Sequence, residues 1–217
     1  LTSVGKESRT NVPYVIGGIS LGGTLAAYAS SIIVKKPSSC ELQFPGRFLG
    51  LAPMSPAVGV HPNAVPSYYI IQALTILAYI APRLQPPLTP LEDPVKYNCP
   101  KGSERNFSGH WPLATSKLLL DITSNRVTKD LNRNDSDGEK LDLSGVPSVL
   151  IIAGEEDDVV PIESVRNFYY KLASNEKEFV AVPQAGHNLM IGPPSSHVAT
   201  TALFRWIEKI VSRGSIS

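Results

Sequence analysis

The segment Pro147–Gly154 (PSVLIIAG) constrains the fold of this chain most strongly, because its apolar run shows no polar alternation. A short run of this kind is typical of a strand that is buried on both faces of a parallel sheet. Apolar runs at Tyr14–Gly17, Phe48–Met54 and Glu178–Val182 also have the composition of strands. We therefore expect four strands that belong to one sheet.

Helix-length segments accompany these strands, at Leu21–Val34, Ile162–Ser174 and Ser196–Val211. Strands that alternate with helical segments of about 10–15 residues form βαβ units. The length of 217 residues suits one compact domain with an insertion better than two domains. The sequence thus predicts an α/β fold with a mostly parallel sheet flanked by helices.

The composition excludes several classes of protein. Hydrophobic residues make up 42% of the chain and charged residues 18%, which supplies a core and argues against disorder. Twenty Lys and Arg residues nearly balance nineteen Asp and Glu residues, so the basic surface needed to bind nucleic acid is absent. Two cysteines, Cys40 and Cys99, are too few for a disulfide scaffold or a zinc cluster. No His or Cys ligands occur at short spacings, and we expect no metal ion.

An insertion interrupts the alternation, from roughly residue 60 to residue 132. Thirteen of the nineteen prolines lie between Pro37 and Pro112. Within the insertion, Tyr68–Ala81 (YYIIQALTILAYIA) is the most apolar stretch of the chain, but it is shorter than the ~20 residues that cross a bilayer. Two interpretations stay open: a buried or packed helix, or a lid helix that lines an acyl pocket or rests on a membrane surface.

The motif Gly18-Ile19-Ser20-Leu21-Gly22 has the pattern Gly-x-Ser-x-Gly, directly after a predicted strand and before a predicted helix. A serine at such a strained strand-to-helix turn exposes its hydroxyl, and the helix N-terminus favours developing negative charge. The alternative is a glycine-rich turn that starts a helix or binds a phosphate. The dinucleotide pattern Gly-x-Gly-x-x-Gly and the P-loop pattern are both absent, so we expect no cofactor. We interpret Ser20 as a nucleophile.

A nucleophilic serine needs a base and an acid, which follow it along the chain in the order acid, then histidine. Four carboxylates, Glu155–Asp158, come directly after the buried strand, at the edge where open α/β sheets bind ligands. His187 follows the strand Glu178–Val182, so we expect it at the same ligand-binding edge of the sheet as these carboxylates. His61 and His110 lie in the insertion away from the expected strand ends, and His197 starts the last helix as a surface residue.

These residues resemble the α/β-hydrolase superfamily, and within it the monoacylglycerol-lipase-like branch, which includes serine aminopeptidases and lysophospholipases. The match rests on Tyr14–Ala27, Phe48–Pro56, Pro147–Pro161 and Lys177–Met190. The resemblance implies Ser20 as nucleophile, Asp157 as triad acid and His187 as base, with Asp158 as a one-residue alternative for the acid. It also implies a backbone oxyanion donor at Leu21.

The same resemblance divides the chain into a first part of the hydrolase core (1–59), a cap (60–132) and a second part of the core (133–217). Asp93–Tyr97 and Leu113–Ile122 resemble parts of the cap. The family has histidine where this chain has Ile19. Its sheet begins several strands before the serine, and its early His-Gly dipeptide is absent here. We therefore expect the N-terminal part of the sheet to be missing and the strand before Ser20 to lie at an exposed edge.

These features predict a serine hydrolase that cleaves lipophilic acyl esters, such as monoacylglycerol or lysophospholipid, through an acyl-enzyme. The expected partner is a small acyl ester, and the apolar cap allows peripheral membrane contact. The expected location is cytoplasmic or peripherally membrane-associated. The alternative is an inactive hydrolase fragment or a non-catalytic binding module.

Overall fold

The computed structural model describes residues 12–35, 46–61, 67–84, 112–123, 141–174 and 176–214. Its four strands form one parallel sheet in the order β1-β2-β3-β4. The strands are β1 (Tyr14–Ile19), β2 (Phe48–Met54), β3 (Val149–Gly154) and β4 (Lys177–Val182). The parallel sheet predicted from the apolar runs is confirmed, and β1 lies at one edge of it.

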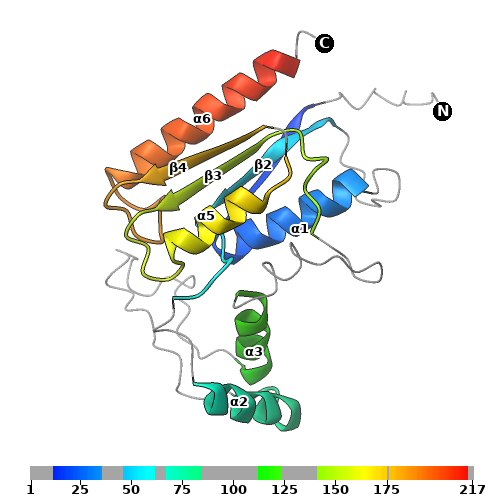
Figure 1. Cartoon of the computed structure of the whole chain (residues 1–217), viewed down its shortest axis with the longest axis vertical. Helices are drawn as coiled ribbons and strands as arrows, with labels where there is room; N and C mark the ends of the chain where they lie inside the picture. The colour runs from blue at the N-terminus through cyan, green and yellow to red at the C-terminus, as the bar shows by residue number, and fades with distance from the viewer. Residues whose placement is uncertain are drawn as a thin grey trace, which may run out of the picture.

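Helices cover both faces of the sheet (Figure 1). They are α1 (Leu21–Lys35) and α5 (Ile162–Lys171) on one face and α6 (Ser195–Gly214) on the other. Strand β3 explains this arrangement, because its odd-numbered residues pack toward α1 and α5 and its even-numbered residues toward α6. Every residue of β3 is buried, as expected for a strand covered on both faces.

Strand β1 is longer than the predicted Tyr14–Gly17, because its glycines continue the strand instead of ending it. Gly17 and Gly18 pair with Ala52 and Pro53 of β2, and the pairing reaches the residue before Ser20. A Cβ atom on Gly17 would lie 3.0 Å from the Ala52 carbonyl oxygen. Glycine at position 17 therefore permits close approach of β1 to β2.

Helix α5 is shorter than the predicted Ile162–Ser174. Its end is fixed by Lys177, whose Nζ donates to the carbonyl oxygens of Tyr169 at 3.0 Å and Leu172 at 2.9 Å. Leu172 has extended backbone and ends the helix. A lysine bonded to the last carbonyls of a helix complements the negative end of the helix dipole.

Two helices of the insertion, α2 (Tyr68–Ile80) and α3 (Leu113–Asp121), contact each other and stand apart from the sheet layers (Figure 1). None of the residues of α2 is buried, so the interpretation as a buried helix is wrong, whereas α2 does pack against α3. In the described part of the chain, no helix is long and apolar enough to cross a membrane. The predicted cap segment Asp93–Tyr97 lies outside the described residues.

Candidate active site

Ser20 occupies the turn between β1 and α1 with a φ of 54°, in the left-handed region that non-glycine residues seldom adopt. Four backbone hydrogen bonds hold it there. Its N–H donates to Met54 at 2.9 Å, and its carbonyl accepts from Gly23 and Ala57, each at 3.0 Å, and from Thr24 at 3.2 Å. The end of β2 and the loop after it therefore support the strained turn. Sequence reasoning did not identify this support.

Glycines allow the strand and the helix to meet at this turn. A Cβ atom on Gly18 would overlap the carbonyl group of Gly22 and lie 2.8 Å from the nitrogen of Gly23. A Cβ on Gly23 would lie 3.2 Å from Pro53, whereas one on Gly22 would meet no atom within 4 Å. The close approach thus requires glycine at position 18 and not at position 22.

Leu21 is the first residue of α1, and its N–H has no intrahelical acceptor. This N–H donates to no other described residue, and neither does the Ser20 hydroxyl. A free N–H beside a serine at a helix N-terminus can receive negative charge that develops on a bound carbonyl oxygen.

Asp157 lies in the turn after β3, is 8% exposed, and uses both carboxylate oxygens. Its Oδ1 accepts hydrogen bonds from the N–H groups of Val159 at 2.9 Å and Val160 at 2.8 Å. Its Oδ2 accepts a hydrogen bond from Nδ1 of His187 at 2.9 Å. Asp158 is exposed, so the histidine contact belongs to Asp157. This bond orients the imidazole and leaves its Nε2 free to accept a proton.

The pKa of Asp157 lies below its ordinary value. Burial by itself would raise this pKa, but hydrogen bonds from His187, Val160 and Val159, together with the charge on His187, outweigh burial. The carboxylate is consequently ionised at neutral pH, as required of a group that stabilises a protonated imidazole.

Backbone contacts fix the acid turn against the histidine loop. The N–H of Glu155 donates to Val182, and the N–H of Glu156 donates to Ala185, each at 3.0 Å. A Cβ on Gly154 would overlap the carbonyl oxygens of Ala185 and Gly186. Glycine at the end of β3 therefore lets the two loops approach each other. A glycine at the end of a buried strand is the sequence feature that could have predicted this close contact.

The remaining histidines lie in different places. The backbone N–H of His61 donates to Val159 at 3.2 Å, so the expectation that His61 lies away from the strand ends is wrong. The loop after β2 returns it to the acid turn. His197 is exposed near the start of α6, as predicted, and His110 lies outside the described residues. No three potential metal ligands cluster within the described ranges.

Comparisons with known proteins identify the family and the fold of the chain. Residues 1–194 match the model of a family described as serine aminopeptidase, S33. No curated protein matches significantly. Similar solved structures include a monoacylglycerol lipase of Paleococcus ferrophilus (TM-score 0.62, 17% identity, 92% of this chain and 69% of that chain covered).

A soluble variant of monoglyceride lipase from Saccharomyces cerevisiae, in complex with a substrate analog, is also similar (TM-score 0.67, 16% identity). Here 91% of this chain and 62% of the lipase chain are covered. The chain thus spans between 62% and 69% of the length of these two lipases. At these identities the likeness establishes the fold.

Proposed function

Because the chain belongs to the serine aminopeptidase S33 family and has an α/β-hydrolase fold, we propose that it hydrolyses carboxylic esters through an acyl-enzyme. The observation that carries this proposal is the hydrogen bond between buried Asp157 and His187. Both residues follow the carboxyl ends of parallel strands, and Ser20 follows the carboxyl end of β1 in the same sheet. A strained serine, an oriented histidine and a buried carboxylate have the chemistry of a serine hydrolase.

In the proposed mechanism the Ser20 Oγ attacks the ester carbonyl while His187 Nε2 accepts the hydroxyl proton. The bond from the carbonyl carbon to the leaving oxygen then breaks, and His187 returns the proton to the alcohol. Water attacks the acyl-enzyme by the same route and releases the acid. Asp157 holds the Nδ1 proton and stabilises the imidazolium.

We assign the Leu21 N–H to the oxyanion hole, since it is the free N–H that follows the nucleophile. A second donor is required for full activity, and removing one donor costs about 10²–10³ in turnover. If the described residues alone form the hole, the alternative of an inactive or non-catalytic binding module gains support.

We further propose a lipophilic acyl substrate and assign residues 60–132 as the cap over it. Helix α2 supports this assignment because it exposes large apolar side chains, among them Tyr69 at 83%, Tyr79 at 90% and Ile80 at 71%. Exposed apolar surface on this scale marks a binding site for ligand, protein or membrane. Two similar structures are lipases of monoacylglycerols, which supports the same substrate class.

Hydrolysis of p-nitrophenyl esters from acetate to laurate tests the substrate class. We expect kcat/KM to rise with chain length up to a limit set by the pocket, and Ser20→Ala to abolish turnover at every length. Asp158→Asn is the matched control and should retain activity. A flat chain-length profile would contradict the lipophilic pocket, whereas hydrolysis that persists in Ser20→Ala would contradict the nucleophile.

The exposed face of α2 also suggests peripheral membrane contact. Sedimentation with neutral phosphatidylcholine vesicles should remove the chain from solution, and Tyr79→Ser with Ile80→Ser should reduce the bound fraction severalfold. Equal sedimentation of both forms would refute a membrane role for α2.

A further inference from the structure

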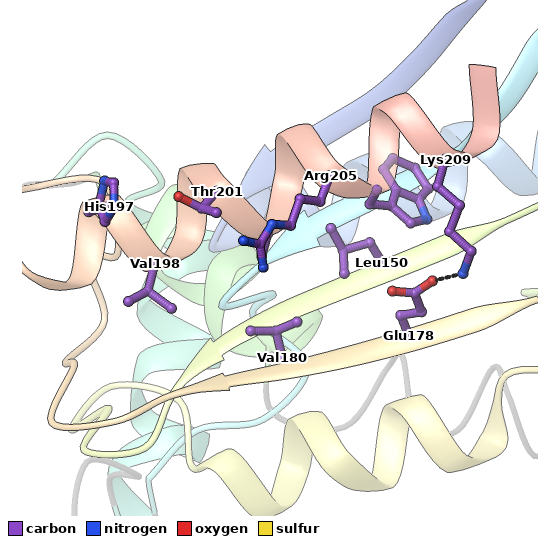
Figure 2. Close-up of a pocket in the computed structure, with 10 residues that line it drawn as sticks. Leu150, Glu178, Val180, His197, Val198, Thr201, Arg205 and Lys209 are labelled. Atoms are coloured by element: carbon purple, nitrogen blue, oxygen red, sulfur yellow. Dashed lines mark hydrogen bonds and ion pairs between the residues drawn. The ribbon is translucent and has the colours of Figure 1, made fainter. Parts of the chain in front are cut away.

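A cavity of about 480 Å³ lies between helix α6 and the sheet (Figure 2), and Ser20, Asp157 and His187 are not among the residues that line it. Its size falls within the ~300–1,000 Å³ of small-molecule sites. Its wall is formed by residues of β3, β4 and α6, namely Leu150, Glu178, Val180, His197, Val198, Thr201, Ala202, Arg205, Trp206 and Lys209. The proposed hydrolase uses none of them.

The inner part of the cavity is apolar. Leu150 and Val180 approach it from the sheet, and α6 contributes Val198 and Ala202. The α6 residues Val198, Thr201 and Ala202, which line the cavity, have short side chains. An open space with apolar walls favours a ligand with an alkyl chain, since each methylene buried there can strengthen binding by up to about fourfold.

One positive charge at the cavity lacks a counterion. Lys209 is neutralised by Glu178, to which it donates a hydrogen bond, and by Glu176 at 3.1 Å. The exposed side chain of Arg205 forms no hydrogen bond or ion pair with any residue in the described ranges. Figure 2 shows its side chain running from α6 toward the sheet, between Thr201 and Leu150. The guanidinium therefore faces the cavity with its donors free.

We propose that this cavity binds a single-chain alkyl carboxylate, with the carboxylate on Arg205 and the alkyl chain along Val180, Val198 and Ala202. A guanidinium presents paired N–H donors that match the two oxygens of a carboxylate. The lone charge fits a monoanion, and the adjacent Glu178 disfavours ligands of higher negative charge. The proposal is independent of the catalytic assignment, because the cavity would bind the carboxylate without reacting with it and is lined by none of the proposed catalytic residues.

Trp206 supplies a direct readout of binding because its side chain lines the cavity. Its exposed fraction of 1% shields it from quencher that is free in solution. The chain contains two tryptophans, Trp111 and Trp206. In a Trp111→Phe background, Trp206 is the remaining fluorophore of its kind. Titration with 10-bromodecanoate, whose bromine quenches indole fluorescence on contact, should then give saturable quenching. The neutral 10-bromodecanol should bind at least fivefold more weakly.

Two variants separate the charge from the space. Arg205→Gln should weaken 10-bromodecanoate binding at least fivefold and leave 10-bromodecanol binding unchanged. Ala202→Leu should weaken both, because it fills the cavity. Arg213→Gln is the matched control: it removes a cation from the same helix that pairs with Glu176 outside the cavity, and it should leave both affinities unchanged.

Circular dichroism of each variant establishes that it is folded. Quenching that is unsaturable, or equal for the acid and the alcohol, would overturn the proposal. An Arg205→Gln variant that binds 10-bromodecanoate as tightly as the parent and the Arg213→Gln control would also overturn it. Because no step requires ester hydrolysis, an inactive chain that binds the carboxylate would overturn the proposed function and leave this site intact.

Discussion

The residues around Ser20 show that two glycines of one motif have different roles. Gly18→Ala places a methyl group against the backbone of Gly22 and Gly23, so the turn must shift. We expect this substitution to lower the free energy of unfolding by roughly 1–3 kcal/mol. Urea denaturation followed by circular dichroism measures the change.

Gly22→Ala is the matched control for this prediction. A Cβ at position 22 meets no atom within 4 Å, and alanine is the better helix former by up to about 1 kcal/mol. The free energy of unfolding should stay the same or rise slightly. Equal destabilisation by the two substitutions would show that the turn between β1 and α1 is not packed as described.

Asp157 links the site to the acid stability of the protein. Because its folded pKa is depressed, its ionised form stabilises the fold above the ordinary aspartate value of about 3.9. This contribution is lost as the pH falls through the lower folded pKa. Asp157→Asn should therefore cost roughly 1–2 kcal/mol at pH 7, and the difference from wild type should shrink below pH 4.

Denaturation curves collected from pH 7 to pH 2 test this prediction, with Asp158→Asn as the control. Asp158 is exposed and should contribute little at any pH. A constant difference between Asp157→Asn and wild type over the whole range would contradict the depressed pKa.

At the scale of elements, Lys177 connects β4 to the end of α5. Its Nζ donates to three carbonyl oxygens and lies 4.9 Å from the centre of the Tyr169 ring. Lys177→Met should lower the free energy of unfolding by roughly 1–2 kcal/mol, because the last carbonyls of α5 lose their donor.

Lys171→Met serves as the comparison, since Lys171 is exposed in the last turn of the same helix and its side chain bonds to no other described residue. Both variants are compared by thermal and urea unfolding. Equal stability of the two variants would mean that the contacts of Lys177 do not hold the end of α5.

The same elements mark how far sequence patterns determine local structure. The buried strand β3 could be predicted because its side chains alone require two covered faces. The end of α5 could not, since it depends on Lys177, which follows the helix and belongs to the next strand. Propensity likewise placed the end of β1 at its glycines, whereas pairing with β2 carries the strand to Ile19.

At the scale of the molecule, the candidate site follows from topology. Parallel strands end at one edge of the sheet, so residues after β1, β3 and β4 could be expected to gather there before any coordinates were known. The resemblance already favoured Asp157 over Asp158, and the turn geometry, which buries the first carboxylate and exposes the second, supports the same choice. The exposure of α2 and the cavity between α6 and the sheet depend on how whole helices are placed. Residue patterns do not specify the placement of helices.

The central claim is that Ser20 is an activated nucleophile, and reaction with a fluorophosphonate probe tests it most directly. Peptide mapping by mass spectrometry should find one labelled peptide that contains Ser20. Ser20→Ala should abolish labelling, and His187→Ala should slow it by orders of magnitude. No labelling of a sample that circular dichroism shows to be folded, or labelling confined to another serine, would contradict the assignment of this chain as a serine hydrolase.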